Sequence, residues 1–323
     1  MILVTGATGF LGSHLIKKLA EKNEPIRAIY RPSSFHLINS EIKNLEWLEA
    51  DILDVDSINA AMKGVTEVYH AAAMVSFDKK NHSLMYKINV NGTENMVNMA
   101  LENKVKKFGY ISSVAVLGRN SASNTLDETS EWEKSKNNSL YATSKMLAER
   151  EVFRGAAEGL NVAIVNPSVI LGFGNWNNSS AKIFKTIYDG MPFYSTGING
   201  FVDVQDVVNC IIQLMDENIF GERFIVNENN YSYQQIFNWI AESLDVTKPT
   251  IKVTKFISEI AWRFEAIKSA ITGKSGLITK ETANTALLQN FYSNQKIKKQ
   301  LNYNFTPIHE TIHHTSKLFL STQ

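Results

Sequence analysis

The stretch Thr5-Gly6-Ala7-Thr8-Gly9-Phe10-Leu11-Gly12 decides the fold of this 323-residue chain. It joins the apolar run Ile2-Leu3-Val4, which is typical of a buried strand, to an amphipathic run that predicts a helix from Phe10 to Glu21. The first glycine permits a tight turn, the second lets backbone approach a bound group, and the third lets the helix pack against the strand. The spacing therefore predicts a strand, a phosphate-binding turn and a helix, as at the start of a doubly wound sheet.

The predicted helix directs unpaired backbone N–H groups and the positive end of its dipole at this turn, an arrangement that suits a pyrophosphate. We therefore predict that NAD(P) binds here. The expected contacts come from the turn and the start of the helix: Gly6, Thr8, Gly9, Phe10, Leu11 and Gly12. The second strand ends in Tyr30-Arg31-Pro32-Ser33-Ser34, without the acid that usually holds a ribose 2′-hydroxyl. Arg31 favours the 2′-phosphate of NADP(H), while NAD(H) stays open.

Strands and helices alternate along the first half of the chain. Apolar runs predict strands at 26–30, 45–49, 65–70, 107–111 and 162–165, and periodic runs predict helices at 56–62, 82–103 and 139–158. Strands that alternate with long helices indicate an α/β fold, here a Rossmann-type doubly wound parallel sheet with helices on both faces. We assign residues 1–166 and 201–227 to the NAD(P)-binding domain. Residues 167–200 and 228–323 should form a smaller, mostly helical C-terminal substrate lobe.

The bulk composition excludes several classes of function. The chain has 33 basic and 32 acidic residues, a net charge of +1 that gives no footprint for nucleic acid or an anionic membrane. No apolar run approaches the roughly 20 residues of a membrane span. The one cysteine, Cys210, lies in an apolar run, so a disulfide within the chain is excluded and a buried thiol is expected. Because the first strand begins at Ile2, we expect no signal peptide and a cytoplasmic enzyme with a small-molecule partner.

A tyrosine and a lysine stand four residues apart near the start of the predicted helix 139–158. Tyr141 and Lys145 share one face of that helix, so the ammonium can lie near the phenol. A free tyrosine has a pKa of about 10, and nearby cations favour its phenolate. Ser112 and Ser113 end the preceding strand, where a hydroxyl can hold a substrate oxygen while Tyr141 moves its proton. We predict hydride transfer that reduces a carbonyl or oxidises a secondary alcohol.

The same tyrosine–lysine spacing occurs a second time, at Tyr292 and Lys296. This second pair follows the predicted sheet and stands beside the basic run Lys296-Ile297-Lys298-Lys299, which indicates a solvated helix. We therefore assign Tyr292 no catalytic role.

A histidine pair near the carboxyl end matches another catalytic motif. His309 and His313, with Glu310 between them, have the spacing of the zinc-protease helix. A catalytic zinc needs a third protein ligand, often an acid further along the chain, and no acidic residue follows His313. We predict no metal site.

Further motifs resemble those of a known family. They are Asp51-Ile52, His70-Ala71-Ala72-Ala73, Asn89-Val90-Asn91-Gly92-Thr93, Ser112-Ser113 with Gly118, Asn166-Pro167-Ser168 and Phe201-Val202-Asp203-Val204. With the glycine stretch and the Tyr141–Lys145 pair, they resemble the extended short-chain dehydrogenase/reductases, which include NAD-dependent epimerase/dehydratase proteins, over nearly the whole chain. Many members have arginine at the position of Asn166. This departure and Arg31-Pro32 are similar to the dihydroflavonol-reductase-like and 3-beta-hydroxysteroid-dehydrogenase-like branch, which mostly uses NADP.

The resemblance implies a role for each matching residue. It selects Ser113 over Ser112 as the catalytic serine, because that serine stands five residues before the glycine at position 118. It implies that Lys145 binds the nicotinamide ribose as well as tuning Tyr141. The remaining implied contacts are Asp51 and Ile52 around the adenine, Ala71, Ala72 and Ala73 along the cofactor, Asn89 on the cofactor side of the site, and Pro167 and Ser168 near the carboxamide.

Other functions and assemblies stay open at this point. A nucleotide-sugar epimerase would use the same residues, because it needs only transient removal and return of hydride. A dehydratase is disfavoured, because Val114 and Ala115 follow Ser113 where such enzymes usually carry acids. A non-catalytic sensor would be expected to lack Tyr141 or Lys145. A monomer and a homodimer are both compatible with the sequence. An apolar substrate pocket could include the following residues, several of which are equally expected in the core: Met74, Val75, Phe77, Phe173, Trp176 and Tyr194.

Overall fold

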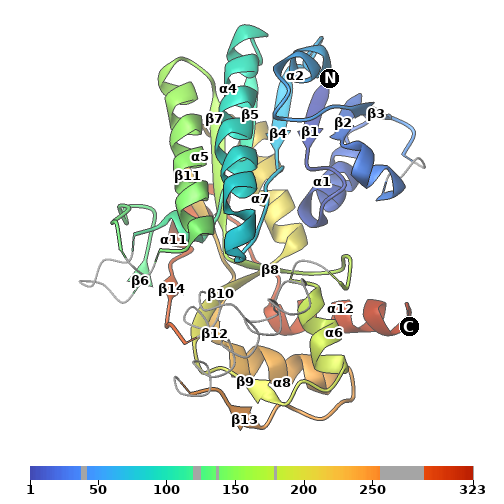
Figure 1. Cartoon of the computed structure of the whole chain (residues 1–323), viewed down its shortest axis with the longest axis vertical. Helices are drawn as coiled ribbons and strands as arrows, with labels where there is room; N and C mark the ends of the chain where they lie inside the picture. Colours follow the sequence, from blue (N-terminus) through green and yellow to red (C-terminus); the bar gives the residue numbers. More distant parts are fainter. Residues whose placement is uncertain (38–41, 119–124, 136–137, 178–179, 255–286, 323) are drawn as a thin grey trace.

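A seven-stranded parallel sheet forms the upper half of the molecule in Figure 1. This computed structural model describes all residues except 38–41, 119–124, 136–137, 178–179, 255–286 and 323. The strands are β1 (Ile2–Thr5), β2 (Ile26–Tyr30), β3 (Leu45–Glu49), β4 (Glu67–His70), β5 (Lys107–Ile111), β7 (Val162–Pro167) and β11 (Arg223–Val226). Their order in the sheet is β11-β7-β5-β4-β1-β2-β3. The chain builds outward from β1 to one side and from β4 to the other, and doubly wound sheets bind ligands at this switch point between β1 and β4.

Helices cover both faces of this sheet, which confirms the predicted fold class. One face carries α1 (Phe10–Ala20) and α7 (Val204–Asp216), and the other carries α2 (Val55–Ala61), α4 (Gly92–Glu102) and α5 (Leu140–Ala157). With both faces covered, every residue of β7 is buried.

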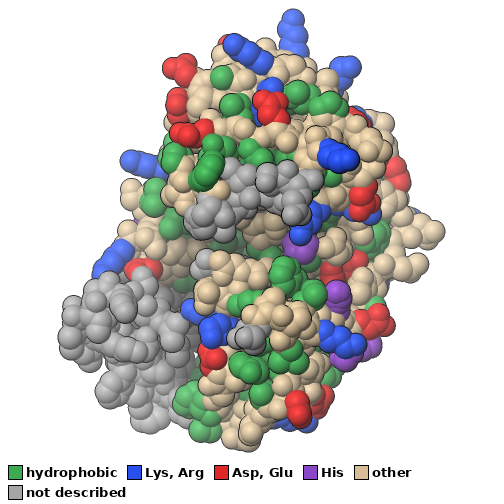
Figure 2. Space-filling view, turned by 90° about the vertical axis from the view of Figure 1, so that its right-hand side faces the viewer, with side chains coloured by type: hydrophobic (Ala, Val, Ile, Leu, Met, Phe, Trp, Pro, Cys, Tyr) green, Lys and Arg blue, Asp and Glu red, His purple; other side chains and the backbone are tan. Residues whose placement is uncertain are grey.

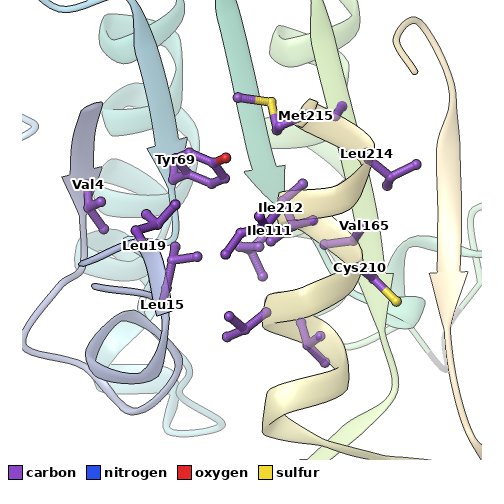
Figure 3. Packing of buried hydrophobic residues seen from close by; sticks show 14 of the residues in the cluster. Val4, Leu15, Leu19, Tyr69, Ile111, Val165, Cys210, Ile212, Leu214 and Met215 are labelled. Atoms are coloured by element: carbon purple, nitrogen blue, oxygen red, sulfur yellow. The ribbon is translucent and has the colours of Figure 1, made fainter. Parts of the chain in front are cut away.

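The core under α1 and α7 is continuous across the sheet (Figure 3). Leu15 and Leu19 of α1 and Met215 of α7 belong to one buried cluster with Val4 of β1. Cys210 lies in the same cluster, and burial raises its pKa well above the usual range. It is the buried thiol that the sequence predicts.

The helix predicted from 82 to 103 is interrupted by a wider turn. It consists of α3 (His82–Tyr86), the π-helical turn η3 (Lys87–Asn91) and α4. Single π turns within helices are frequent at functional sites. Here the turn contains Asn89, whose side chain is buried.

A smaller lobe lies below the sheet in Figure 1. Its elements are the strands β8 (Val169–Leu171), β10 (Ile198–Asp203) and β12 (Asn229–Ser232), the strand pair β9 (Phe193–Tyr194) and β13 (Ile251–Lys252), and the helices α6 (Lys182–Tyr188), α8 (Tyr233–Ser243) and α12 (Ile308–Leu320). By contrast, α11 (Gln295–Leu301) packs on β11 and α7, and its Ile297 and Leu301 belong to the core of the large sheet. The predicted division into lobes stays a prediction, and residues 255–286 of it lie outside the described residues.

Charges of both signs are interspersed over the face shown in Figure 2, in agreement with the small net charge. Within the described ranges we find no helix with the length and apolar content that crossing a bilayer requires.

Candidate active site

The glycine turn after β1 is packed backbone against backbone. Gly6 has a φ of +69°, in the left-handed region that favours glycine, and a Cβ there would lie 2.7 Å from the Ala72 nitrogen. A Cβ on Gly12 would lie 2.0 Å from the Gly6 carbonyl oxygen. The Gly9 amide donates to the same oxygen at 2.9 Å. This is the close packing that the glycine spacing predicts.

The amino terminus of α1 suits an anion. Its N-cap residue, Gly9, provides no side-chain cap, and the first turn contains no acidic residue. The helix dipole and the amides of the first turn therefore favour a negative group at this end. A Cβ on Gly9 would meet the Gly6 oxygen at 3.0 Å and no other atom within 4 Å, so the space beside Gly9 is open, as the close approach of a pyrophosphate requires. Thr8, Phe10 and Leu11 flank Gly9 along the chain.

The residues expected to hold the adenosine end follow two neighbouring strands. Arg31 comes directly after β2 and is exposed, and its carbonyl accepts hydrogen bonds from the Ser34 amide at 2.8 Å and the Ser34 hydroxyl at 2.9 Å. Asp51 and Ile52 follow β3, which pairs with β2. The Asp51 carboxylate accepts from the Leu53 amide at 2.9 Å, and Ile52 is buried. Arg31, Asp51 and Ile52 thus share the carboxyl edge of the sheet.

A buried histidine supports the loop after β4. His70 pairs through Nδ1 with Thr5 Oγ1 at 2.7 Å and through Nε2 with Thr93 Oγ1 at 3.0 Å. Burial lowers the pKa of His70 to about 3, so its ring is neutral. Thr5 Oγ1 accepts from the Ala72 amide at 3.1 Å. This chain of contacts holds the segment 71–73 beside the glycine turn, a supporting role that the sequence predictions did not include.

Ser113 and Tyr141 meet beyond the carboxyl end of β5. Ser113 begins the short 3-10 helix η4 (Val114–Val116), where its Oγ accepts from the Ala115 amide at 3.2 Å. The Ser113 side chain also influences the phenol of Tyr141, which lies in the first turn of α5. Burial raises the pKa of Tyr141 above its ordinary value, and the polar side chain of Ser113 opposes that rise. The phenol is therefore protonated in the protein alone.

Lys145 lies one helical turn after Tyr141 and is 2% exposed. Its ammonium donates to the Tyr110 hydroxyl at 2.7 Å and to the Ile111 carbonyl at 2.8 Å. Burial lowers the pKa of Lys145 to about 7, and the charge of Glu149 opposes this shift. An ammonium has three donors, so these two bonds leave one for a ligand or for Tyr141.

Asn89 shapes the site through the backbone. Its Oδ1 accepts from the Met74 amide at 2.7 Å, and its Nδ2 donates to the Met74 carbonyl and to Ser144 Oγ, both at 2.9 Å. It thereby ties the segment after the three alanines to α5. Pro167 ends β7 and Ser168 follows it. Both are buried, and the Ser168 amide donates to the carbonyl of Val226 in β11 at 3.1 Å.

Comparison with known proteins decides the family. The model of the NAD dependent epimerase/dehydratase family matches residues 2–227. The chain belongs to this family. It is therefore an NAD(P)-dependent enzyme of the extended short-chain dehydrogenase/reductase type, as the resemblance implied.

Relatives of this family member cover most of its length. The sterol demethylase protein B of Methylococcus capsulatus is 32% identical over 257 residues, which are 78% of this chain and 76% of that protein. A putative dihydroflavonol 4-reductase of Synechocystis sp. is 28% identical over 308 residues, 92% of this chain and 88% of that protein. Among solved structures, the crystal structure of gox2253 has a TM-score of 0.84 and 30% identity, and the match covers 100% of this chain and 98% of that chain.

The second tyrosine–lysine pair of this epimerase/dehydratase family member lies in a different setting from the predicted one. The prediction that Tyr292 stands on a solvated helix was wrong: it is buried, in β14 (Phe291–Tyr292), which pairs with β6 (Thr125–Leu126). Its ring packs in a small core that includes Ile225. Lys296, on α11, forms an ion pair with Glu222 at 2.7 Å. That Tyr292 has no catalytic role stays a prediction.

The histidine pair of the family member lies on α12, far along the chain from the glycine turn. His309 and His313 are both exposed there. Among the residues that the structure describes, no three His, Cys, Asp or Glu side chains are grouped as metal ligands would be.

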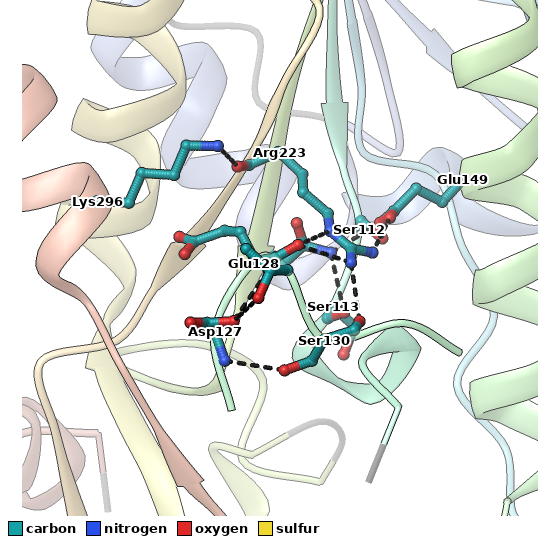
Figure 4. Close-up of polar contacts among 10 residues, drawn as sticks. Ser112, Ser113, Asp127, Glu128, Ser130, Glu149, Arg223 and Lys296 are labelled. Carbon is teal, nitrogen blue, oxygen red and sulfur yellow. Dashed lines mark hydrogen bonds and ion pairs between the residues drawn. The ribbon is translucent and has the colours of Figure 1, made fainter. Parts of the chain in front are cut away.

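A buried polar network that the sequence analysis missed lies beside Ser113 (Figure 4). Glu149 Oε1 accepts from Arg223 Nη1 at 3.1 Å, and Oε2 accepts from Asn166 Nδ2 at 2.7 Å and from the Ser112 hydroxyl. Asn166 Nδ2 also donates to the Ser113 carbonyl at 3.2 Å. One signal was present, because Glu149 follows the lysine of the site by one helical turn. Arg223 lies 74 residues further on, and no spacing connects the two.

Proposed function

We propose that this protein is an NADP(H)-preferring oxidoreductase that reduces the carbonyl group of an apolar small molecule or oxidises the matching secondary alcohol. Ser113, Tyr141 and Lys145 are its proposed catalytic residues. One observation carries the proposal: Tyr141, whose phenol is influenced by the Ser113 side chain, stands one helical turn from the buried ammonium of Lys145. Proton transfer and stabilisation of the phenolate need these three groups together.

Each of the three residues has a defined task at the substrate oxygen. When bound, the nicotinamide supplies the hydride in reduction and accepts it in oxidation. Ser113 holds the substrate oxygen while Tyr141 donates its proton in reduction, and burial keeps the phenol in the protonated form that this direction requires. In oxidation Tyr141 accepts the hydroxyl proton, and the charge of Lys145 stabilises the resulting phenolate.

The proposed cofactor contacts run along the carboxyl edge of the sheet. They are Gly6, Thr8, Gly9, Phe10, Leu11, Gly12, Arg31, Asp51, Ile52, Ala71, Ala72, Ala73, Asn89, Tyr141, Lys145, Pro167 and Ser168. The exposed guanidinium of Arg31 directly after β2 supports the preference for a 2′-phosphate, because a cation there pairs with that group.

The side chains around the proposed acid support an apolar substrate. The Phe77 ring stands edge-on to that of Tyr141, with centroids 6.2 Å apart, and Val75 is 63% exposed nearby in sequence. Trp176, in contrast, packs on Phe319 in the core of the lobe, with ring centroids 4.9 Å apart, so we leave it out of the pocket. The name of the Synechocystis relative, a 4-reductase, supports reduction over epimerisation.

Turnover by tyrosine variants tests this function. Apolar ketones and aldehydes should oxidise NADPH in the presence of the protein, whereas nucleotide sugars should not be turned over. On an accepted substrate, Tyr141→Phe should lower kcat by about 10²–10⁴, the usual worth of positioned proton transfer. Its affinity for NADPH should stay nearly unchanged, because the ring remains. Tyr292→Phe is the matched control and should keep wild-type turnover. Wild-type kcat in Tyr141→Phe would refute the chemistry.

A further inference from the structure

The carboxylate of Glu149 is enclosed by hydrogen-bond donors from three other elements (Figure 4). Its side chain is 4% exposed, and that of its ion-pair partner Arg223 is 19% exposed. Ser112 comes from the end of β5, Asn166 from β7 and Arg223 from β11. In all of these contacts the carboxylate only accepts, which is what its ionised form does. A charge buried in this way is stabilised by these protein hydrogen bonds and not by water.

Two of these donors connect Glu149 to the backbone of the proposed catalytic serine. The same amide nitrogen of Asn166 that donates to Glu149 also donates to the Ser113 carbonyl. Ser112, the residue before it, donates its hydroxyl to the carboxylate. The backbone that carries Ser113 is therefore fixed by Glu149 at two consecutive residues.

Glu149 also stands one helical turn after Lys145, on the same face of α5. The titratable groups near that ammonium are Tyr110 from β5, His70 from β4 and Glu149 from α5, with Tyr141 one helical turn before it. Burial raises the pKa of both tyrosines and lowers that of His70, so these three groups are neutral. Among them, Glu149 supplies the negative charge.

Arg223 is anchored independently of Glu149. Its Nε and Nη2 donate to the Glu128 carbonyl at 3.0 and 2.9 Å, and Nη2 also donates to the Ser130 carbonyl at 3.0 Å. Its own carbonyl accepts from Lys296 at 2.9 Å. The Glu128 side chain completes the arrangement by accepting from the Ile225 amide at 2.8 Å. Arg223 therefore holds the carboxylate of Glu149 in one place relative to the sheet edge.

We propose that Glu149 and Arg223 form a positioning unit for the active site: the pair fixes the Ser113 backbone through Asn166 and Ser112 and places a carboxylate one helical turn from Lys145. The inference rests on the proposed function of Ser113 and Lys145. Glu149 and Arg223 are positioning residues and act through Ser113 and Lys145. Glu149 acts through the charge of Lys145, because a neighbouring carboxylate favours the ammonium over the neutral amine.

A direct titration of Lys145 tests the electrostatic part without turnover. The 13Cε resonance of Lys145, assigned by its loss in Lys145→Met, is followed against pH in the protein without added cofactor. In Glu149→Gln the midpoint should fall by about one pH unit, the low end of the effect of a neighbouring opposite charge. Glu149→Asp retains the charge and should keep the midpoint near the wild-type value. Glu158→Gln, which removes the ion pair with Arg154 at the carboxyl end of the same helix, should leave it unchanged. An unchanged midpoint in folded Glu149→Gln would overturn the inference.

A double variant covers the case in which Glu149→Gln fails to fold. Removing one partner leaves the half-buried Arg223 without its carboxylate, whereas Glu149→Gln combined with Arg223→Met removes both charges. This variant should fold and should show the same lowered midpoint of Lys145. A wild-type midpoint in the double variant would also overturn the inference.

Kinetics separate this inference from the proposed function. On a substrate that wild-type protein reduces, the double variant should lose at least about tenfold in kcat, while the KM for NADPH changes by less than about threefold, as a displaced Ser113 would cause. If Tyr141→Phe is inactive while the double variant keeps wild-type kcat, the positioning unit is refuted and the function stands. If Tyr141→Phe remains active, the function is refuted, and the titration of Lys145 still decides whether Glu149 governs its charge.

Discussion

Side chains added at Gly12 and at Gly9 should have opposite effects on stability and on cofactor binding, although a Cβ at either position would approach the same carbonyl oxygen, that of Gly6. In Gly12→Ala the new Cβ would lie 2.0 Å from the Gly6 oxygen, 2.6 Å from the Gly6 carbonyl carbon and 2.8 Å from the Ala7 Cα. All three are backbone atoms, so α1 must move from the turn by roughly 1.4 Å to reach an ordinary contact distance of about 3.4 Å.

The movement of α1 lowers the free energy of unfolding by an amount that can be estimated. Overpacking a well-packed core costs about 1–3 kcal/mol, and we expect the upper end here because neither side of the contact is a flexible side chain. The entropy of unfolding is about 2.1 cal/mol/K per residue, or about 0.7 kcal/mol/K for a cooperative unit of this length. A loss of about 3 kcal/mol then lowers Tm by about 4 °C.

Gly9→Val should affect cofactor binding far more than stability. Its Cβ would approach the Gly6 oxygen at 3.0 Å and would otherwise enter open space, in an extended backbone conformation that valine tolerates. Its Tm should fall less than that of Gly12→Ala, because the Gly6 carbonyl has to move by only a few tenths of an ångström, while the side chain takes the space proposed for the pyrophosphate and abolishes NADPH binding.

Thermal unfolding and titration with NADPH fluorescence measure the two effects on the same samples. Equal Tm values for wild type and Gly12→Ala would refute the packing argument. Retained NADPH affinity in folded Gly9→Val would show that the pyrophosphate binds elsewhere.

Two further predictions concern charge. Arg31→Ala should weaken NADPH binding about tenfold or more and leave NADH affinity nearly unchanged, because only the 2′-phosphate contact is removed; equal losses for both cofactors, measured by fluorescence titration, would contradict the assignment of Arg31. The second concerns Lys145, whose pKa is about 10.4 in the unfolded chain and about 7 in the folded protein. Between these two pH values the folded state binds fewer protons than the unfolded state. The contribution of Lys145 to the free energy of unfolding therefore rises with pH in this range. Between pH 7 and pH 8.5, the free energy of unfolding of wild type without cofactor should therefore rise by about 1.5 kcal/mol relative to that of Lys145→Met. Urea titrations of both proteins measure this difference. A difference that does not change with pH would show that the ammonium is not desolvated.

The parts of the fold that the sequence predicts correctly are those governed by local periodicity. The glycine stretch fixes the first strand, turn and helix, and the apolar run Val162-Ala163-Ile164-Val165 has the character of a strand buried on both faces, as β7 is. The pairing of β14 with β6 joins residues about 166 positions apart in two-residue strands, which are too short to produce any periodic pattern. The error over Tyr292 follows from this, since the nearby lysines suggested a solvated helix.

The site residues also divide into those that a local sequence pattern predicts and those whose contacts depend on tertiary packing. The four-residue spacing of Tyr141 and Lys145 on one helix is a local pattern, and the Ser113 side chain influences the Tyr141 phenol from the end of the preceding strand. The bonds of Lys145 to Tyr110 and Ile111 depend on how α5 packs over β5, which no spacing encodes. The Glu149–Arg223 pair likewise exists only after β11 has docked beside β7.

The contacts of β11 bear on the behaviour of this protein at high concentration. β11 is an outer strand of the sheet, and an outer strand offers unpaired amides and carbonyls to any other chain that can align with it. Here the Ile225 amide is taken by the Glu128 carboxylate and the Arg223 carbonyl by the Lys296 ammonium. An intruding strand would have to displace both charged side chains before it could pair. This edge is thus protected against the edge-to-edge association that leads to aggregation.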